Sequence, residues 1–187
     1  MRLFAERGFA TTRVEDIVRE AGYTRGAFYF HFANKLDCFW DVIAYREELR
    51  GDWVAHVTAD LDRGTTLEQV LALTFARFAE VEQGVGAWML VMVDFFQQHR
   101  DDDDVQQKLA GVYAVWHGSL LRFLRALHSG GWIPGHPDLD LLATQIFAYV
   151  EGLTAHSRLY GFAPKRFEAA LFDGLVSLLS RSEGRRP

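Results

Sequence analysis

The chain has 187 residues, of which 49% are hydrophobic and 24% charged, a balance typical of a folded globular protein and not of a disordered one. Its formal net charge is −5, but residues 1–50 carry eight basic and eight acidic side chains, so the acidic excess lies in residues 51–187. A nucleic-acid-binding function therefore has to be argued from the placement of basic residues and not from their total.

The cysteine content and the apolar stretches indicate the compartment. Cys38 is the only cysteine, which excludes an internal disulfide and suits a reducing environment. The first residues lack the features of a signal peptide. The longest apolar stretch, Ala87–Phe96, is shorter than the ~20 residues needed to cross a bilayer, and it contains Asp94. These features predict a soluble cytoplasmic protein with no membrane partner.

Hydrophobic residues recur at helical spacing along nearly the whole chain, and no stretch alternates as a β-strand would. Residues 1–7 are typical of the end of a helix that Gly8 stops. The segment from Thr12 to Glu15 has the form of a capping box, with Thr12 as the cap, and predicts the start of a second helix. Gly22 is expected to end it.

Two further helices are expected before residue 51. Thr24 is placed to cap a short third helix that continues through Phe32. Asn34 is placed to cap a fourth helix that runs from Lys35 to about Arg50. Together with the preceding helices, these segments predict a compact head at residues 1–50.

The remainder, residues 51–187, is expected to form a larger helical bundle. Glycines and prolines divide it, and Pro164 suits the first position of the last helix. The expected helices lie near 52–63, 66–83, 86–99, 103–129, 138–161 and 164–182. The predicted fold is therefore all-α, with nine to ten helices in total: a three-helix head carrying a helix-turn-helix, followed by this body.

Residues 12–32 suggest a helix-turn-helix, since two short helices are joined by a tight turn at Gly22-Tyr23. Phe28 and Phe32 lie four positions apart and are expected to point into the head. The other side of the third helix is then free to enter the major groove of DNA. The residues expected on the DNA side, or beside it for phosphate contacts, are Thr24, Arg25, Gly26, Ala27, Tyr29, Phe30, His31 and Lys35.

These residue types suit different parts of a DNA duplex. Arg25 can form two hydrogen bonds with guanine, and Ala27 or Tyr29 can contact a thymine methyl group. Gly26 permits close backbone approach, and Thr24, His31 and Lys35 are expected at phosphates. A packed three-helix module that binds nothing is the alternative.

The head resembles the DNA-binding domain of the TetR family. The resemblance lies in LFAERGFATT (3–12), VEDI (14–17), EAGYTRGAFYFHF (20–32) and NK (34–35), about a quarter of the chain. It implies a homodimeric regulator, most members being repressors, in which each head binds half of a palindromic double-stranded operator. It also implies that Tyr29, His31 and Lys35 occupy DNA-contacting positions, and that residues 25–27 occupy variable base-contacting ones.

Two features depart from the family pattern. The first helix begins at Met1 and is shorter than in most members, which suggests either a truncated chain or a head that binds more weakly. Arg13 stands where the family commonly has a small hydroxyl residue. Arg13 can still reach a phosphate, so it is counted among the DNA-binding residues, and capping of the second helix is expected to rest on Thr12.

The body is rich in aromatic residues and methionine, and the resemblance implies that its middle helices enclose a small-molecule effector. An aromatic lining with a few polar groups suits an apolar or aromatic effector. Ordinary core packing is the alternative for each of these side chains. The candidate effector-binding residues are Trp88, Met92, Phe96, His99, Trp116, Phe147 and His156.

The last two expected helices each carry an apolar stripe, and facing copies of them would form a four-helix dimer interface. The alternative is that the stripes pack inward. The candidate interface residues are Leu142, Ile146, Leu153, Phe167, Leu171 and Leu175.

No cofactor or metal is expected, because no cysteine cluster or closely spaced histidine pair is present. The sequence also lacks a nucleophile motif, a phosphate-binding glycine loop and a paired carboxylate with an activated partner, which argues against an enzyme. Two alternatives to a regulator stay open: a helical interaction protein whose head has lost DNA binding, and a small all-helical enzyme.

Overall fold

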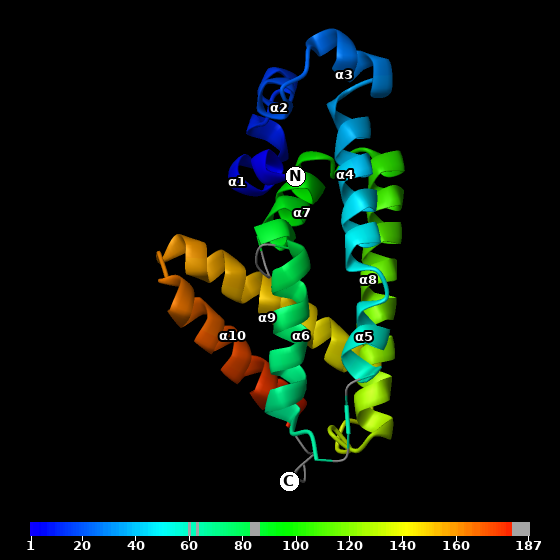
Figure 1. Cartoon of the computed structure of the whole chain (residues 1–187), viewed down its shortest axis with the longest axis vertical. Helices are drawn as coiled ribbons and strands as arrows, with labels where there is room; N and C mark the ends of the chain where they lie inside the picture. The colour runs from blue at the N-terminus through cyan, green and yellow to red at the C-terminus, as the bar shows by residue number, and fades with distance from the viewer. Residues whose placement is uncertain (60, 63, 83–86, 181–187) are drawn as a thin grey trace. The chain divides into compact units, whose positions relative to one another are not determined.

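The computed structural model describes residues 1–59, 61–62, 64–82 and 87–180, and these residues form ten α-helices and no strand (Figure 1). The all-α prediction is thereby confirmed. The helices are α1 (Arg2–Thr11), α2 (Val14–Ala21), α3 (Arg25–His31), α4 (Lys35–Arg50), α5 (Trp53–Ala59), α6 (Leu67–Glu82), α7 (Ala87–Gln98), α8 (Asp103–Ser129), α9 (Leu139–Leu159) and α10 (Pro164–Leu179). None of the described helices is long and apolar enough to cross a membrane.

Several helix boundaries are set by particular residues, among them the expected Asn34 and Pro164. Asn34 and Asp138 begin α4 and α9, because each side chain accepts a hydrogen bond from a main-chain N–H in the first turn. Pro164 is the first residue of α10, where its missing N–H costs nothing. The expected helix ends at 63, 83, 86 and 182, and the expected break at 84–86, lie outside the described residues.

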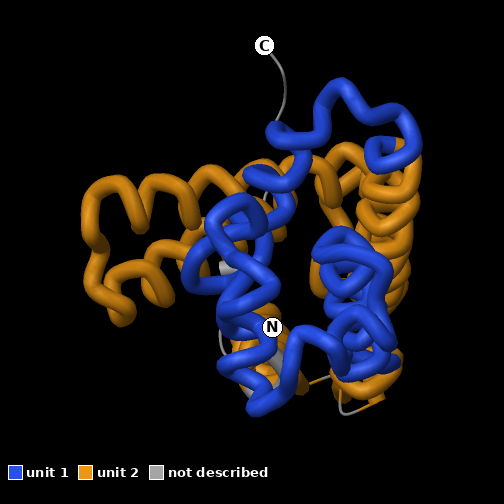
Figure 2. Tube along the Cα trace, turned by 90° about the horizontal axis from the view of Figure 1, so that it is seen from above, with its two compact units in different colours: residues 1–51, 87–106 blue, residues 52–86, 107–187 orange. Residues whose placement is uncertain are grey.

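The chain divides into two compact units, shown in blue and orange in Figure 2. Residues 1–51 and 87–106 form the first unit, and residues 52–86 and 107–187 form the second. The segment that contains α7 was expected in the body but packs with the head, because α7 lies against α1. Gly8 helps the two helices to approach closely, since a Cβ atom at this position would lie 3.1 Å from Asp94 Oδ2.

Aromatic rings fill the core of the first unit. The Phe39 ring centroid lies 5.1 Å from that of Phe4, 5.0 Å from that of Phe9 and 4.5 Å from that of Phe95. Most of these pairs meet edge-on or tilted, the arrangement that aromatic quadrupoles favour. The rings come from α1, α4 and α7, so they hold these three helices together.

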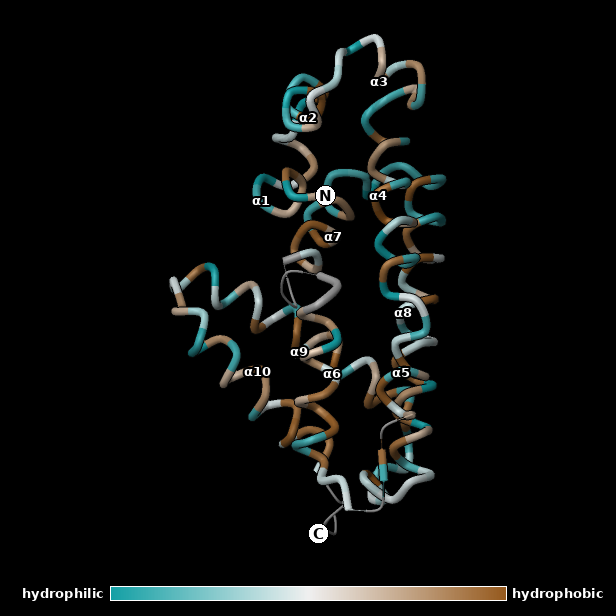
Figure 3. Tube along the Cα trace, viewed as in Figure 1, coloured by the Kyte–Doolittle hydropathy of each residue, from teal (hydrophilic) through white to brown (hydrophobic). Residues whose placement is uncertain are grey.

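The core of the second unit is built from α5, α6, α8, α9 and α10. Figure 3 shows hydrophobic and hydrophilic residues alternating along α8, as expected for a helix with one buried face. The hydroxyl of Tyr149 donates a 2.6 Å hydrogen bond to the Ala170 carbonyl and joins α9 to α10. Trp132 Nε1 donates to the Thr65 carbonyl at 2.7 Å and fastens the turn after α8.

Candidate nucleic-acid interface

A tight turn joins α2 to α3, as the Gly22-Tyr23 sequence predicts. Gly22 has φ +71°, a left-handed conformation that glycine adopts without steric cost. The N–H of Tyr23 donates to the Val18 carbonyl at 2.8 Å, and the N–H of Gly22 donates to the Arg19 carbonyl at 3.3 Å. These bonds satisfy carbonyls at the end of α2 and set the direction of α3.

The start of α3 and its inner face agree with the sequence-based expectation. The Thr24 hydroxyl oxygen accepts a 3.2 Å hydrogen bond from the Ala27 N–H and caps the helix. Phe28 is 5% exposed and lies in a small core with Val18 and Cys38. Phe32 packs against this core, and its ring centroid lies 5.2 Å from that of Phe28.

The outer side of α3 is left in solvent. Tyr29 is 49% exposed and Phe30 is 84% exposed, although both are large aromatic residues. Thr24, Arg25, Gly26 and His31 are also exposed, and Ala27 is half-buried. The helix therefore separates an inner face anchored by phenylalanines from an outer face that carries most of the predicted DNA-binding residues.

Arg25 already has partners in the free chain. Its guanidinium lies 3.1 Å from the Glu15 carboxylate on α2, and it lies 6.0 Å from the centroid of the Tyr29 ring. Both side chains of the ion pair are more than half exposed, so solvent screens their attraction and the pair can open at low cost. Glu15 was not among the predicted site residues.

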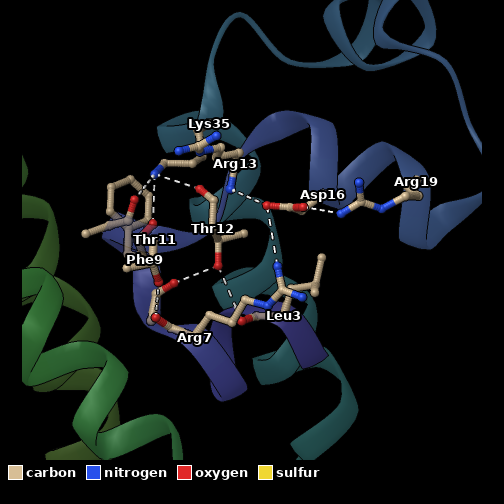
Figure 4. Close-up of polar contacts among 11 residues, drawn as sticks. Leu3, Arg7, Phe9, Thr11, Thr12, Arg13, Asp16, Arg19 and Lys35 are labelled. Atoms are coloured by element: carbon tan, nitrogen blue, oxygen red, sulfur yellow. Dashed lines mark hydrogen bonds and ion pairs between the residues drawn. The ribbon is translucent and has the colours of Figure 1, made fainter.

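Lys35 occupies a different environment from the one predicted. Its Nζ donates hydrogen bonds to the carbonyls of Phe9 (2.7 Å) and Thr12 (3.0 Å), as Figure 4 shows. It also donates to the Ala10 carbonyl at 3.3 Å. An ammonium group has three N–H donors, so the carbonyls at the end of α1 occupy all of them. The phosphate contact expected of this side chain is therefore not available to it in the free chain.

The expected capping of α2 by Thr12 is also wrong. Thr12 is fully buried, and its hydroxyl donates to the Gly8 carbonyl at 2.7 Å and lies 3.3 Å from the Leu3 carbonyl. The reason is the break in α1 at Gly8 (φ +78°), which frees carbonyls that Thr12 then satisfies. Arg13 is the residue that precedes α2 instead, and its side chain is exposed.

Asp16 takes the role that was assigned to Glu15 in the capping box. Its Oδ2 accepts a 3.4 Å hydrogen bond from the Arg13 N–H. Desolvation opposes ionisation here, but that hydrogen bond and the guanidinium groups of Arg19 and Arg7 together lower the pKa of Asp16. Arg7 lies 3.5 Å from this carboxylate and joins the end of α1 to α2.

The predicted effector-binding residues of the first unit fall in two groups. Trp88 and Met92 are buried in its core, with the Trp88 ring stacked 6.1 Å from Phe39. His99 is half-buried and its Nδ1 lies 3.0 Å from the Phe95 carbonyl, whereas Phe96 is exposed. Trp88 and Met92 therefore have the environment of ordinary core residues, which is the alternative that the sequence left open.

The predicted effector-binding residues of the second unit lie on α8 and α9. Trp116 is buried, and Phe147 is half-buried with its ring stacked 6.2 Å from that of His117. His156 is exposed and its Nδ1 lies 2.9 Å from the Gly152 carbonyl. It is therefore not the interior polar group that was expected.

Sequence reasoning missed two residues beside these rings. The Tyr113 ring centroid lies 5.3 Å from that of Trp116, and the Tyr113 hydroxyl interacts with the Glu151 side chain. Burial raises the pKa of Glu151, and burial and the nearby carboxylate raise the pKa of Tyr113. The sequence did offer a signal for Glu151, because this acidic residue follows Phe147 by one helical turn and therefore lies on the same face of the helix.

The predicted dimer-interface residues lie largely inside a single chain. Leu142, Ile146, Leu171 and Leu175 are between 2% and 9% exposed and belong to the core of the second unit. Leu153 and Phe167 are half-buried and pack against the same core. The first four cannot form a dimer interface, because their side chains are already covered by α5, α6, α8, α9 and α10 of their own chain.

Within the described ranges, no group of three histidine, cysteine, aspartate or glutamate side chains is placed to hold a metal ion. Cys38 is buried, and burial raises the pKa of its thiol, which disfavours the reactive thiolate.

Comparisons with known proteins agree with these observations. Residues 1–42 match the family model described as "Bacterial regulatory proteins, tetR family", and residues 65–180 match the one described as "BetI-type transcriptional repressor, C-terminal". The transcriptional regulator TtgR of Pseudomonas putida is 30% identical over 155 residues, which cover 81% of this chain and 73% of TtgR. The transcriptional repressor ComR of Escherichia coli is 24% identical over 161 residues, which cover 84% of this chain and 75% of ComR.

A solved structure shares the fold. GusR of Salmonella enterica superposes with a TM-score of 0.62 at 20% sequence identity, and the match covers 96% of this chain and 91% of GusR. Members of the family are transcriptional regulators rather than enzymes, and they bind DNA operators and small-molecule effectors and act as dimers. The two family models, the 30% identity to TtgR and the exposed outer face of α3 lead to one conclusion: this chain is a DNA-binding transcriptional regulator of the TetR family.

Proposed function

We propose that the chain is a dimeric repressor that binds a palindromic operator through the outer face of α3 and leaves it when a small apolar or aromatic effector binds. The observation that carries this proposal is the division of α3 into two faces. Phe28 is buried on one side, while Tyr29 and Phe30 remain exposed on the other. Exposed aromatic residues on a short helix cost free energy unless a partner covers them.

The outer face offers groups that suit base edges and phosphates. Arg25 can exchange the Glu15 carboxylate for the O6 and N7 atoms of guanine. Tyr29 and Ala27 are placed for thymine methyl groups, and Gly26 lets the backbone approach the duplex. Thr24, His31 and Arg13 are placed for phosphates around these contacts, and Phe30 lies beside them.

Phosphate contact by Lys35 is not part of the proposal. The Lys35 ammonium binds carbonyls of α1, so its contribution is to hold α1 and α4 in position. The N-terminal N–H groups of α4 are a separate source of favourable interaction with a phosphate.

The release of DNA is assigned to the second unit. Trp116 and Phe147 supply aromatic surface on α8 and α9, and both belong to the predicted effector-binding set. Repression, as opposed to activation, is supported by the printed descriptions of ComR and of the model that matches residues 65–180, both of which are repressors.

The test is a gel-shift titration with the DNA that flanks the gene for this chain, since regulators of this kind often bind nearby. We expect a complex whose affinity falls as salt rises, because phosphate contacts release counterions. Tyr29→Ala should weaken binding by about 5- to 30-fold, equivalent to about 1–2 kcal/mol. The matched control is Tyr160→Ala, which removes an exposed tyrosine of the second unit.

The two variants make the outcome clear. Tyr160→Ala should bind DNA as the wild type does, and both variants should melt within a few degrees of it. If Tyr29→Ala binds with unchanged affinity, the outer face of α3 is not the DNA-binding surface and the proposal is wrong.

A further inference from the structure

We infer that Tyr23, in the turn between α2 and α3, is a further DNA-binding residue whose hydroxyl donates a hydrogen bond to a backbone phosphate. The inference rests on the proposed function, because it adds one contact beside the outer face of α3. Tyr23 is not among the residues that the sequence predicted for DNA binding. Its assigned partner is a phosphate and not a base, so it should add affinity for DNA of any sequence.

The side chain of Tyr23 is left in solvent. It is 70% exposed, more than the side chains of Tyr29, Tyr45 and Tyr160. Within the described ranges, no hydrogen bond, ion pair or ring contact involves its phenol group, whereas the Tyr29 ring lies 5.3 Å from that of Phe28. The ring and the hydroxyl of Tyr23 are therefore both available to a ligand.

Tyr23 stands at a position from which an apolar residue would normally pack inward. It directly precedes Thr24, the cap of α3, and a side chain there often packs against the fourth residue of the helix, here Phe28. Phe28 packs with Val18 and Cys38 instead. Tyr23 therefore has no part in the core of the head, and burial does not explain a large aromatic residue in this turn.

The main chain holds Tyr23 in one place. Its N–H donates to the Val18 carbonyl at 2.8 Å, and Gly22 before it has φ +71°. Directly after it, the Thr24 hydroxyl oxygen accepts from the Ala27 N–H at 3.2 Å. Because the backbone is already fixed, binding through Tyr23 restricts the side chain alone, which keeps the entropic cost of the contact small.

The helix-turn-helix arrangement brings this turn to a phosphate strand. In such a unit the first helix crosses the DNA backbone, and the second lies in the major groove with its N-terminal residues at the bases. The turn leads from one helix to the other. When the outer face of α3 faces the bases, Tyr23 therefore lies at the edge of the groove, which phosphate oxygens line.

The charges near the turn allow a phosphate to approach. The acidic side chains of α2 all pair with arginines, in the pairs Glu15–Arg25, Asp16–Arg19 and Glu20–Arg2. The carboxylates next to Tyr23 are therefore compensated. A phenol hydroxyl is a hydrogen-bond donor, and tyrosine is one of the residues that contact phosphate oxygens in protein–DNA complexes.

The test removes the hydroxyl and keeps the ring. Tyr23→Phe and the wild type are titrated by gel shift at low salt with two duplexes of equal length, the DNA that flanks the gene for this chain and one of unrelated sequence. We expect the affinity for both to fall by about 5- to 20-fold, because a hydrogen bond to a charged group is lost and every sequence has the same phosphates. The salt slope should not change, since a phenol hydroxyl carries no charge and releases no counterion.

The matched control is Tyr45→Phe, which removes the hydroxyl of a tyrosine on α4 that is 50% exposed. It should bind both duplexes as the wild type does. Both variants should melt within about 2 °C of the wild type, because neither hydroxyl is buried. A loss of affinity without a loss of stability distinguishes a DNA contact from a structural role.

Three results would overturn the inference: unchanged affinity of Tyr23→Phe for both duplexes, a loss confined to one of them, or an equal loss in Tyr45→Phe. The proposed function is judged separately, by Tyr29→Ala in the same gel shift. If Tyr29→Ala weakens binding and Tyr23→Phe does not, this inference alone fails. If the wild type binds neither duplex, both fail.

Discussion

The ammonium nitrogen of Lys35 lies 4.2 Å from the centroid of the Phe9 ring and donates a 2.7 Å hydrogen bond to the carbonyl of the same residue. The first residue of α4 thus binds the end of α1 through both a ring and a carbonyl. Burial lowers the pKa of Lys35, as expected for an ammonium removed from water. The contact makes Lys35 a structural link between two helices of the head.

Lys35→Met keeps most of the length of the side chain and removes its charge and its donors. We expect it to lower the free energy of unfolding by about 1.5–3 kcal/mol, the usual range for hydrogen bonds to a charged group. Urea denaturation followed by circular dichroism measures the change. Lys165→Met, which alters an exposed lysine of α10, should leave the stability nearly unchanged.

The same variant distinguishes the structural role from a phosphate contact. Loss of a phosphate-binding lysine reduces the salt slope of DNA affinity by about one. At a temperature at which Lys35→Met is folded, we expect an unchanged slope. A slope reduced by one would mean that the ammonium leaves the α1 carbonyls when DNA binds.

Glu15→Gln tests how the Glu15–Arg25 ion pair affects DNA binding. The carboxylate must leave Arg25 before the guanidinium can contact a base, and its own charge repels phosphates. Because an exposed pair is worth only about 0.2–1 kcal/mol, we expect a rise in affinity of about 2- to 5-fold. Glu48→Gln, at an exposed site on α4, is the control in the same gel shift. Weaker binding by Glu15→Gln would instead mean that the carboxylate holds Arg25 in its productive position.

Glu151 is expected to make the folded chain less stable as pH rises. Because burial raises its pKa in the folded chain, the protonated form favours folding, and that contribution is lost as pH rises through the folded pKa. Glu151→Gln should therefore melt at a higher temperature than the wild type at pH 7, by about 2–4 °C at most. The difference should shrink toward pH 4, and a lower melting temperature at pH 7 would contradict the assignment.

Leu142 tests the correction to the dimer interface. Because this side chain is buried in its own chain, Leu142→Ala should lower the free energy of unfolding by about 2–5 kcal/mol. Leu141→Ala alters the exposed neighbour and should cost less than about 0.5 kcal/mol. Sedimentation equilibrium should show the same dimer affinity for Leu142→Ala as for the wild type wherever it is folded. A folded but monomeric Leu142→Ala would restore Leu142 to the interface.

Local sequence signals predicted the helix-turn-helix well. The Thr24 cap, the Gly22 turn and the spacing of Phe28 and Phe32 each act within a few residues, so their geometry follows from the sequence nearby. The inner and outer faces of α3 follow from the same spacing.

Contacts between distant segments could not be predicted in this way. Lys35 and Thr12 have side chains suited to several partners, and the break of α1 at Gly8 decides which carbonyls are free for them. The apolar stripes of α9 and α10 were visible in the sequence, but periodicity does not tell whether a stripe faces its own core or another copy. Leu142 and Leu171 face the core.

The exposure of Phe30 gives complex formation a thermal signature. An aromatic ring that is 84% exposed in the free chain is hydrated, and a duplex bound as proposed to the outer face of α3 would displace that water. Loss of that water makes the heat capacity of association more negative, so the binding enthalpy should fall more steeply with temperature than in a Phe30→Ser variant. Calorimetric titrations at several temperatures would separate this apolar contribution from the salt-dependent one that the surrounding basic groups supply.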